Sequence, residues 1–136
     1  NNKKIVFPVH PRTKKQILML FGKSFLKQEL SDFLLLPPVS FLDTIMLISN
    51  ADIIVTDSGG IQKEAYFFNK KSLILREETE WVEIIEEKAA VLVGVEKKRI
   101  IEGYSVIKGL EPSFKPIFGD GMAGLFICQT ILKELK

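Results

Sequence analysis

The stretch DIIVTDSGGIQKEAYFF (52–68) decides the fold of this chain. Its first part, DIIVTD (52–57), is apolar almost throughout, and its last part, IQKEAYFF (61–68), has the pattern of an amphipathic helix. An apolar run without in-out alternation is typical of a strand in a parallel sheet that helices cover on both faces. The stretch therefore predicts one strand, loop and helix unit of an α/β protein.

The same alternation runs along the rest of the chain. The other predicted strands are KIVFPV (4–9), DFLLLP (32–37), SLILR (72–76) and AVLVG (90–94). The other predicted helices are RTKKQILMLF (12–21), FLDTIMLISN (41–50), EWVEIIEEK (80–88), EKKRIIEGYSVIK (96–108) and GLFICQTILKELK (124–136). This order predicts an α/β fold with a Rossmann-like doubly wound parallel sheet.

Composition narrows the class of protein. With 136 residues, 46% of them hydrophobic, the chain is the size of one globular domain. A formal net charge of +2 is too small to indicate a nucleic-acid partner. No apolar run is long enough to predict a membrane span. Cys128, the single cysteine, has no partner for an internal disulfide, so we expect a reducing, cytoplasmic compartment and a buried packing role for this residue.

The loop between the strand and helix of the opening stretch can hold a phosphate. Gly59 and Gly60 let backbone approach a ligand without a Cβ, and the free N–H groups of a first helical turn attract anions. A plain alternative is that Ser58 caps the helix and the glycines only permit a tight turn. The loop lacks the residues of GxGxxG and P-loop motifs. Glu64 lies one helical turn further on and can either accept hydrogen bonds from ribose hydroxyls or be a solvated helix residue.

His10 follows the first predicted strand, between Pro8 and Pro11. The prolines stiffen this loop. An imidazole there is suited to proton transfer or to hydrogen-bonding a phosphate, although an exposed loop residue is the plainer interpretation. Because the chain has no second histidine and no cysteine at ligand spacing, we expect no zinc site.

The segment LREETEW (75–81) follows another predicted strand. Thr79 is the predicted N-cap of the next helix, and a helix dipole favours acidic residues near its first turn. That interpretation leaves Arg76 and Trp81 without a role, and a ligand phosphate or a partner surface can use either.

Five segments now stand in a particular order: FPVHPRT (7–13), LPPVSFLD (36–43), TDSGGIQKEA (56–65), LREETEW (75–81) and FGDG (118–121). In this order the chain resembles, over essentially its whole length, the carboxyl-terminal half of the non-hydrolysing UDP-N-acetylglucosamine 2-epimerases. The resemblance implies one half of a two-domain glycosyltransferase B type fold. Residues 1–136 are then a carboxyl-terminal UDP-binding domain that lacks its first strand and helix and the whole amino-terminal domain.

The resemblance also implies roles for individual residues. The loop Ser58–Gly60 binds the diphosphate, Glu64 binds the ribose hydroxyls, and His10 matches the active-site histidine of the family. Phe41 is a packing partner for uracil, and a core role for it is equally consistent with the sequence. At Trp81 many relatives have an arginine that belongs to their ligand site, so no phosphate contact is carried over to this position.

The activity implied by the resemblance is interconversion of UDP-N-acetylglucosamine and UDP-N-acetylmannosamine. UDP is eliminated to give a 2-acetamidoglucal and is added back after C2 has changed face, without a metal or redox cofactor. The implied partners are UDP, the UDP-sugar substrate, the amino-terminal domain and a second copy in a homodimer. The catalytic carboxylates of the family lie in the amino-terminal domain, so we expect the 136-residue chain alone to be inactive.

Other functions remain open on the sequence. A 2-epimerase of UDP-diacetamido uronic acids shares the same carboxyl-terminal motifs. A nucleotide-sugar glycosyltransferase of the same fold would differ in the placement of its glutamate and would transfer sugar to an acceptor. A non-catalytic α/β module would have no affinity for uridine nucleotides. A dehydrogenase domain is disfavoured because no Gly-rich fingerprint follows a strand.

Overall fold

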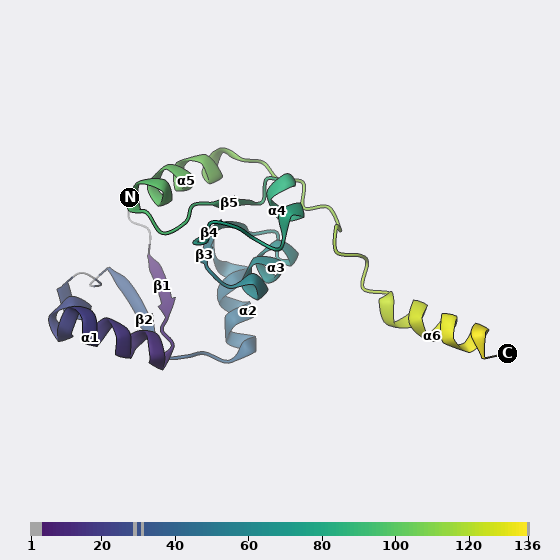
Figure 1. The fold of residues 1–136 in the computed structure, drawn as a ribbon, viewed down its shortest axis with the longest axis horizontal. Helices are drawn as coiled ribbons and strands as arrows, with labels where there is room; N and C mark the ends of the chain where they lie inside the picture. Colours follow the sequence, from purple (N-terminus) through teal and green to yellow (C-terminus); the bar gives the residue numbers. More distant parts are fainter. Residues whose placement is uncertain (1–3, 29, 31, 136) are drawn as a thin grey trace. The chain divides into compact units, whose positions relative to one another are not determined.

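The computed structural model describes residues 4–28, 30 and 32–135, with the backbone alone for residues 23, 24 and 26–28. The chain divides into two compact units, Asn1–Met46 and Leu47–Lys136. Each unit is built from strands that alternate with helices (Figure 1). Of the helices in the described residues, none has the length and apolar character needed to cross a membrane.

The first unit contains a parallel pair of strands joined by a helix. Strand β1 (Ile5–Pro8) pairs with β2 (Phe33–Leu36), with Pro8 opposite Leu36. Helix α1 (Pro11–Gln28) connects them and begins with proline, whose fixed φ suits a first helical position. Gly22 has φ 76° and ψ 175°, a conformation that favours glycine, and it kinks the helix. The helix therefore continues beyond the predicted range 12–21.

Helix α2 (Phe41–Asn50) begins in the first unit and ends in the second. Ser40 and Asp43 form a reciprocal cap at its start. The Ser40 Oγ accepts from the Asp43 N–H at 3.2 Å, and Asp43 Oδ2 accepts from the Ser40 N–H at 3.3 Å. Such a capping box satisfies two backbone donors that a helix start otherwise leaves unpaired.

The second unit is built on a three-stranded parallel sheet. Its strands are β3 (Ile53–Thr56), β4 (Lys71–Ile74) and β5 (Ala90–Leu92), in that order across the sheet. Helix α3 (Gly59–Phe67) follows β3, α4 (Val82–Glu86) follows β4, and α5 (Lys97–Gly109) follows β5. Helix α6 (Ala123–Glu134) is the last element and buries none of its residues.

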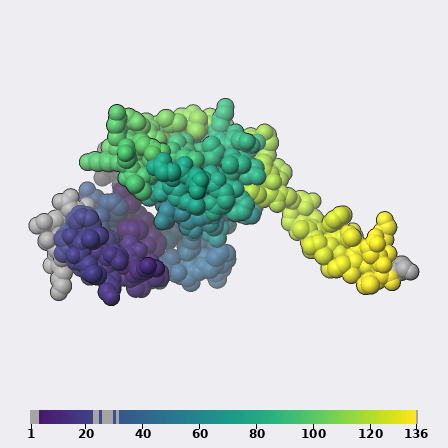
Figure 2. Space-filling view, viewed as in Figure 1, coloured from purple at the N-terminus to yellow at the C-terminus, as the bar shows by residue number. Residues whose placement is uncertain are grey.

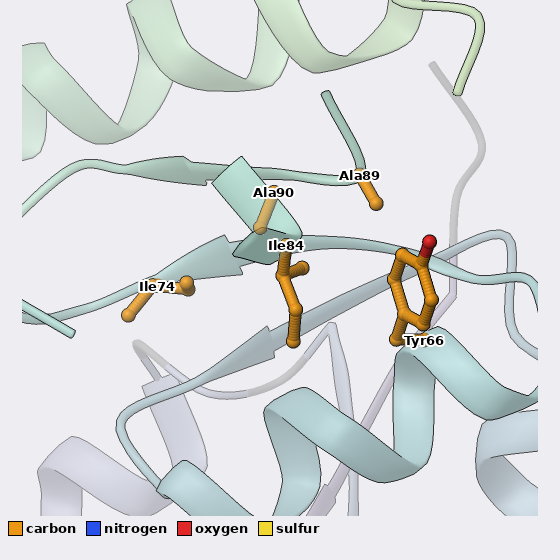
Figure 3. Packing of buried hydrophobic residues seen from close by; sticks show 5 residues of the cluster. All are labelled: Tyr66, Ile74, Ile84, Ala89 and Ala90. Atoms are coloured by element: carbon orange, nitrogen blue, oxygen red, sulfur yellow. The ribbon is translucent and has the colours of Figure 1, made fainter. Parts of the chain in front are cut away.

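Helices cover both faces of this sheet. Ile74 and Leu73 are neighbours on β4, so their side chains point to opposite faces. Ile74 packs with Tyr66 of α3 and Ile84 of α4, and Figure 3 shows Ile84 between the other two. On the opposite face Leu73 packs with Ile107 of α5. In Figure 2 the green part of the chain, which includes α5, lies against the teal part, which includes β4. Each such buried aliphatic side chain contributes about 1.5–3 kcal/mol.

The predicted fold class is confirmed, with differences in detail. Among the described residues the strands pair as two parallel sheets, where the sequence predicted one. Helix α4 starts at Val82 with Trp81 at its N-cap position, so the prediction of Thr79 as N-cap was wrong. The prediction that Cys128 is buried was also wrong: it is exposed, because α6 buries none of its residues in the described part of the chain.

Candidate functional site

The junction of β3 and α3 has the geometry of a capped helix start. Ser58 is the N-cap, with φ −85° and ψ 125°, and its Oγ accepts from the Ile61 N–H at 3.5 Å. Its carbonyl oxygen accepts from the Gln62 N–H at 3.2 Å. The Thr56 Oγ1 in turn accepts from the Ser58 N–H at 3.0 Å. Ser58 is therefore fixed on both sides, and the capping role considered for it from the sequence is confirmed.

The amides of Gly59 and Gly60 follow this cap. In the part of the chain that the structure describes, neither N–H donates to an acceptor. They lie at the positive end of the α3 dipole, where a bound anion is stabilised. Space around the first glycine is limited, because a Cβ on Gly59 would collide with the Glu80 carboxylate. A Cβ on Gly60 would meet nothing closer than the Ser58 Oγ at 3.8 Å, so this side of the loop is open.

The segment LREETEW lies against the same helix start. The Arg76 Nη1 donates to Glu80 Oε2 at 2.8 Å. A hydrogen bond from its own backbone N–H, reinforced by the Arg76 guanidinium, lowers the pKa of the Glu80 carboxyl below its ordinary value. The Trp81 Nε1–H donates to the Gly59 carbonyl oxygen at 2.9 Å. Sequence reasoning gave neither Arg76 nor Trp81 a structural role. Their partners are Glu80, which lies beside Gly59, and Gly59 itself, in the loop Ser58–Gly60 (the SGG loop).

Glu64 is half-buried on α3, one turn beyond the glycines. Its Oε2 is enclosed, and no donor in the described residues pairs with it. An enclosed oxygen without a donor is unfavourable, because its desolvation is not compensated. The last torsion of a glutamate is soft, so this carboxylate can turn towards a donor that arrives beside α3. Glu64 is not the fully solvated helix residue of the plainer interpretation.

His10 is exposed and directly precedes α1. Its Nδ1 accepts from the Arg12 N–H at 3.2 Å, and its carbonyl oxygen accepts from the Lys14 N–H at 3.0 Å. A ring nitrogen that accepts carries no proton, so in the neutral imidazole the proton is on Nε2. The backbone of α1 thereby selects the tautomer in which Nε2–H is the donor.

Phe41 is the first residue of α2, and 66% of its surface is exposed. This exposure excludes a core role for Phe41 within the described residues and leaves its ring free to stack. Phe41 and His10 belong to the first unit, and Ser58–Gly60 and Glu64 belong to the second. The structure brings together the members of the second set, which share α3 and its N-cap.

The chain is similar to known proteins over nearly its whole length. Residues 1–132 match the sequence model of the family described as UDP-N-acetylglucosamine 2-epimerase. The chain belongs to this family. Its fold is also that of a family member: a solved UDP-GlcNAc 2-epimerase of Methanocaldococcus jannaschii, in complex with UDP-GlcNAc and UDP, superimposes with a TM-score of 0.85 at 34% identity. That likeness covers 97% of this chain and 36% of the M. jannaschii chain.

Two curated relatives are 2-epimerases named for different UDP-sugars. A UDP-N-acetylglucosamine 2-epimerase homolog of Methanococcus maripaludis is 39% identical over 133 residues, which are 96% of this chain and 36% of the relative. A UDP-2,3-diacetamido-2,3-dideoxy-D-glucuronate 2-epimerase of Pseudomonas aeruginosa is 37% identical over 131 residues, 95% of this chain and 35% of the relative. The chain thus spans about a third of the length of the curated 2-epimerases it matches.

Proposed function

We propose that this chain is the UDP-binding, carboxyl-terminal part of a UDP-N-acetylglucosamine 2-epimerase. The observation that carries the proposal is the pair of unpaired amides of Gly59 and Gly60 at the start of α3. The match of residues 1–132 to the family supports it, as does the UDP in the complex of the M. jannaschii relative. The whole protein interconverts UDP-N-acetylglucosamine and UDP-N-acetylmannosamine by eliminating UDP and adding it back.

The proposed role of the SGG loop is to hold the diphosphate while negative charge develops on it. In the elimination, a base takes the proton from C2, the electron pair of that C–H bond forms the C1–C2 double bond, and the bond between C1 and the β-phosphate oxygen breaks with its electron pair leaving on UDP. Fixed amide donors at a helix start stabilise this leaving group without having to reorganise. In the return step the C1–O bond forms again, and C2 receives a proton on its other face.

Three other side chains have proposed roles in binding the nucleotide. Glu64 accepts hydrogen bonds from the ribose hydroxyls, which supply the donor that its enclosed Oε2 lacks among the described residues. His10 donates from Nε2–H to the diphosphate, since its Nδ1 is engaged by the Arg12 N–H. Phe41 stacks on uracil with its exposed ring.

The remaining partners are also proposals. Residues 1–136 require an amino-terminal domain that supplies the catalytic carboxylates, and the whole enzyme acts as a cytoplasmic homodimer. No metal or redox cofactor takes part in the proposed reaction.

An assay of epimerisation tests the proposal at the level of the whole enzyme. The full-length protein should convert UDP-N-acetylglucosamine to UDP-N-acetylmannosamine, and His10→Gln should lower kcat on the order of a hundredfold or more, as loss of a proton-transferring or charge-stabilising group does. The 136-residue chain alone should show no turnover. Turnover by this chain alone would refute the requirement for an amino-terminal domain.

A second candidate substrate is a UDP-diacetamido uronic acid. It is favoured by the 37% identity to the P. aeruginosa enzyme, which is close to the 39% found with the M. maripaludis homolog. Both substrates share UDP, so the proposed half-site serves either reaction. Comparison of kcat/KM for the two UDP-sugars with the full-length enzyme separates the two activities.

A further inference from the structure

We propose that Trp81 is a positioning residue for the diphosphate site. Its indole N–H holds the carbonyl of Gly59, and this contact sets the direction in which the Gly60 amide faces a ligand. The inference rests on the proposed function, because it concerns the same loop. It assigns Trp81 no contact with the nucleotide.

The hydrogen bond from Trp81 acts at the most flexible point of the site. Gly59 and Gly60 have no Cβ, so the backbone between Ser58 and Ile61 has more accessible conformations than other residues would allow. The Trp81 Nε1–H donates to the Gly59 carbonyl oxygen at 2.9 Å, across 22 residues of sequence. Fixing the Gly59 carbonyl fixes the peptide plane that it shares with the Gly60 amide. One side chain therefore orients one of the two donors offered to a phosphate.

A second contact from the same segment reaches the next residue on that side of α3. The Thr79 hydroxyl donates to Gln62 Oε1 at 2.6 Å and accepts from the Trp81 N–H at 3.1 Å. Gln62 is fully buried, with 0% of its surface exposed. Residues three apart lie on the same side of a helix, so Trp81 and Thr79 bind Gly59 and Gln62 from the same side of α3. The first turn of α3 is thus tied to residues 79–81 at both of its ends.

The indole itself is held by an aromatic cluster. The rings of Trp81 and Phe118 meet edge to face, with centroids 5.6 Å apart and an interplanar angle of 87°. The Lys63 Nζ lies 4.5 Å from the Trp81 ring centroid and 4.7 Å from that of Phe118, within cation–π range of both. These contacts restrict the indole to an orientation in which its N–H faces Gly59. Phe118, the first residue of FGDG, acts on the loop through Trp81.

A purely structural role for Trp81 makes a different prediction from a positioning role. If Trp81 only packs, its replacement weakens the fold and lowers every affinity of this site to the same extent. If Trp81 orients the Gly60 amide, its replacement weakens binding of the phosphates and leaves binding of the nucleoside unchanged. The ratio of UDP affinity to uridine affinity separates the two roles.

The test uses Trp81→Phe in the 136-residue chain, which keeps an aromatic ring and removes the N–H donor. Phe67→Ala is the matched control, because Phe67 contacts the same Phe118 ring, at 5.7 Å between centroids, and is 59% exposed. Titrations with UDP and with uridine are followed by NMR, together with hydrogen exchange of the Ile61 amide, the first hydrogen-bonded amide after the cap, in the free protein. Phe118→Leu, which loosens the indole without touching Gly59, is a second variant.

In Trp81→Phe we expect UDP binding to weaken about five- to tenfold, the loss that corresponds to one hydrogen bond, with uridine binding unchanged. Exchange at Ile61, whose N–H is bonded to the Ser58 Oγ, should become faster, and Phe118→Leu should change both quantities in the same direction by less. Phe67→Ala should match the wild type. Equal losses for UDP and uridine, or unchanged UDP affinity with unchanged exchange, would overturn the inference. If the wild type binds no UDP, the proposed function fails, and the exchange measurement alone decides whether Trp81 positions the loop.

Discussion

The hydroxyl of Tyr66 in α3 donates a hydrogen bond to the carbonyl oxygen of Lys115, 2.8 Å away and 49 residues later in the chain. This contact ties the helix that carries the SGG loop to the segment after α5. The Tyr66 ring also packs against Phe114 and Phe118, with centroids 5.4 and 5.7 Å away. The aromatic cluster around Trp81 is therefore anchored to the sheet through Tyr66, which is 4% exposed.

Tyr66→Phe should lower the free energy of unfolding by about 0.5–1.5 kcal/mol, because it removes this hydrogen bond and keeps the buried ring. The hydrogen bond is only partly buried, so the loss should stay within this range. Urea unfolding measures the change. An unfolding midpoint equal to that of the wild type would show that the contact does not hold the segment.

A second prediction concerns pH and the ion pair between Glu87 and Lys115. The Lys115 Nζ donates to Glu87 Oε1 at 2.9 Å, and the Ser113 hydroxyl donates to Glu87 Oε2 at 2.8 Å. The hydrogen bond from Lys115, followed by that from Ser113, lowers the pKa of the Glu87 carboxyl. A carboxyl with a lowered pKa in the folded state stabilises the fold above its unfolded pKa. This contribution disappears as the pH falls through the folded pKa.

Wild type and Glu87→Gln should therefore differ in unfolding free energy at neutral pH, with the wild type more stable. The difference should shrink as the pH is lowered past the ordinary glutamate range and vanish once Glu87 is protonated in the folded state. Denaturant unfolding at a series of pH values and constant ionic strength measures it. A difference that stays constant down to strongly acidic pH would contradict this account of Glu87.

Two glycines of α5 should respond to alanine in opposite ways. A Cβ on Gly103 would collide with Cγ1 of the buried Val93, whereas a Cβ on Gly109 would meet nothing within 4 Å. Alanine has the higher helix propensity by about 0.8–1 kcal/mol, so Gly109→Ala should stabilise the protein by up to that amount. At Gly103 overpacking costs about 1–3 kcal/mol, so the net effect should be destabilising. Thermal unfolding of both variants tests this contrast. A stabilised Gly103→Ala variant would contradict the collision between a Cβ at position 103 and Val93.

The sequence alone predicted the elements that depend on local pattern. The strand that becomes β4 was recognisable because Leu73 and Ile74 are buried on opposite faces, which removes the alternation of a half-exposed strand. The cap at Ser58 was recognisable because capping is decided within three residues. The order of the five short segments sufficed to identify the family.

Contacts between distant segments were not predictable in this way. Threonine is a residue type common at N-caps. The hydroxyl of Thr79 instead accepts from the Trp81 N–H and donates to Gln62, which is 17 residues earlier in the chain. The contact of Trp81 with Gly59 likewise depends on how β3 and β4 align. Burial of Cys128 was inferred from the apolar face of its own helix, whereas burial depends on what covers that face.

The most direct test of the proposed function is a titration of the 136-residue chain with UDP, UMP and ADP, followed by calorimetry or NMR, for the wild type and Glu64→Ala. Circular dichroism of both proteins establishes that they are folded. The account predicts saturable binding that prefers UDP, chemical-shift changes at the Gly59 and Gly60 amides, and clearly weaker binding by the variant. No binding of UDP at millimolar concentration by the folded chain, or equal binding by wild type and variant, would contradict it.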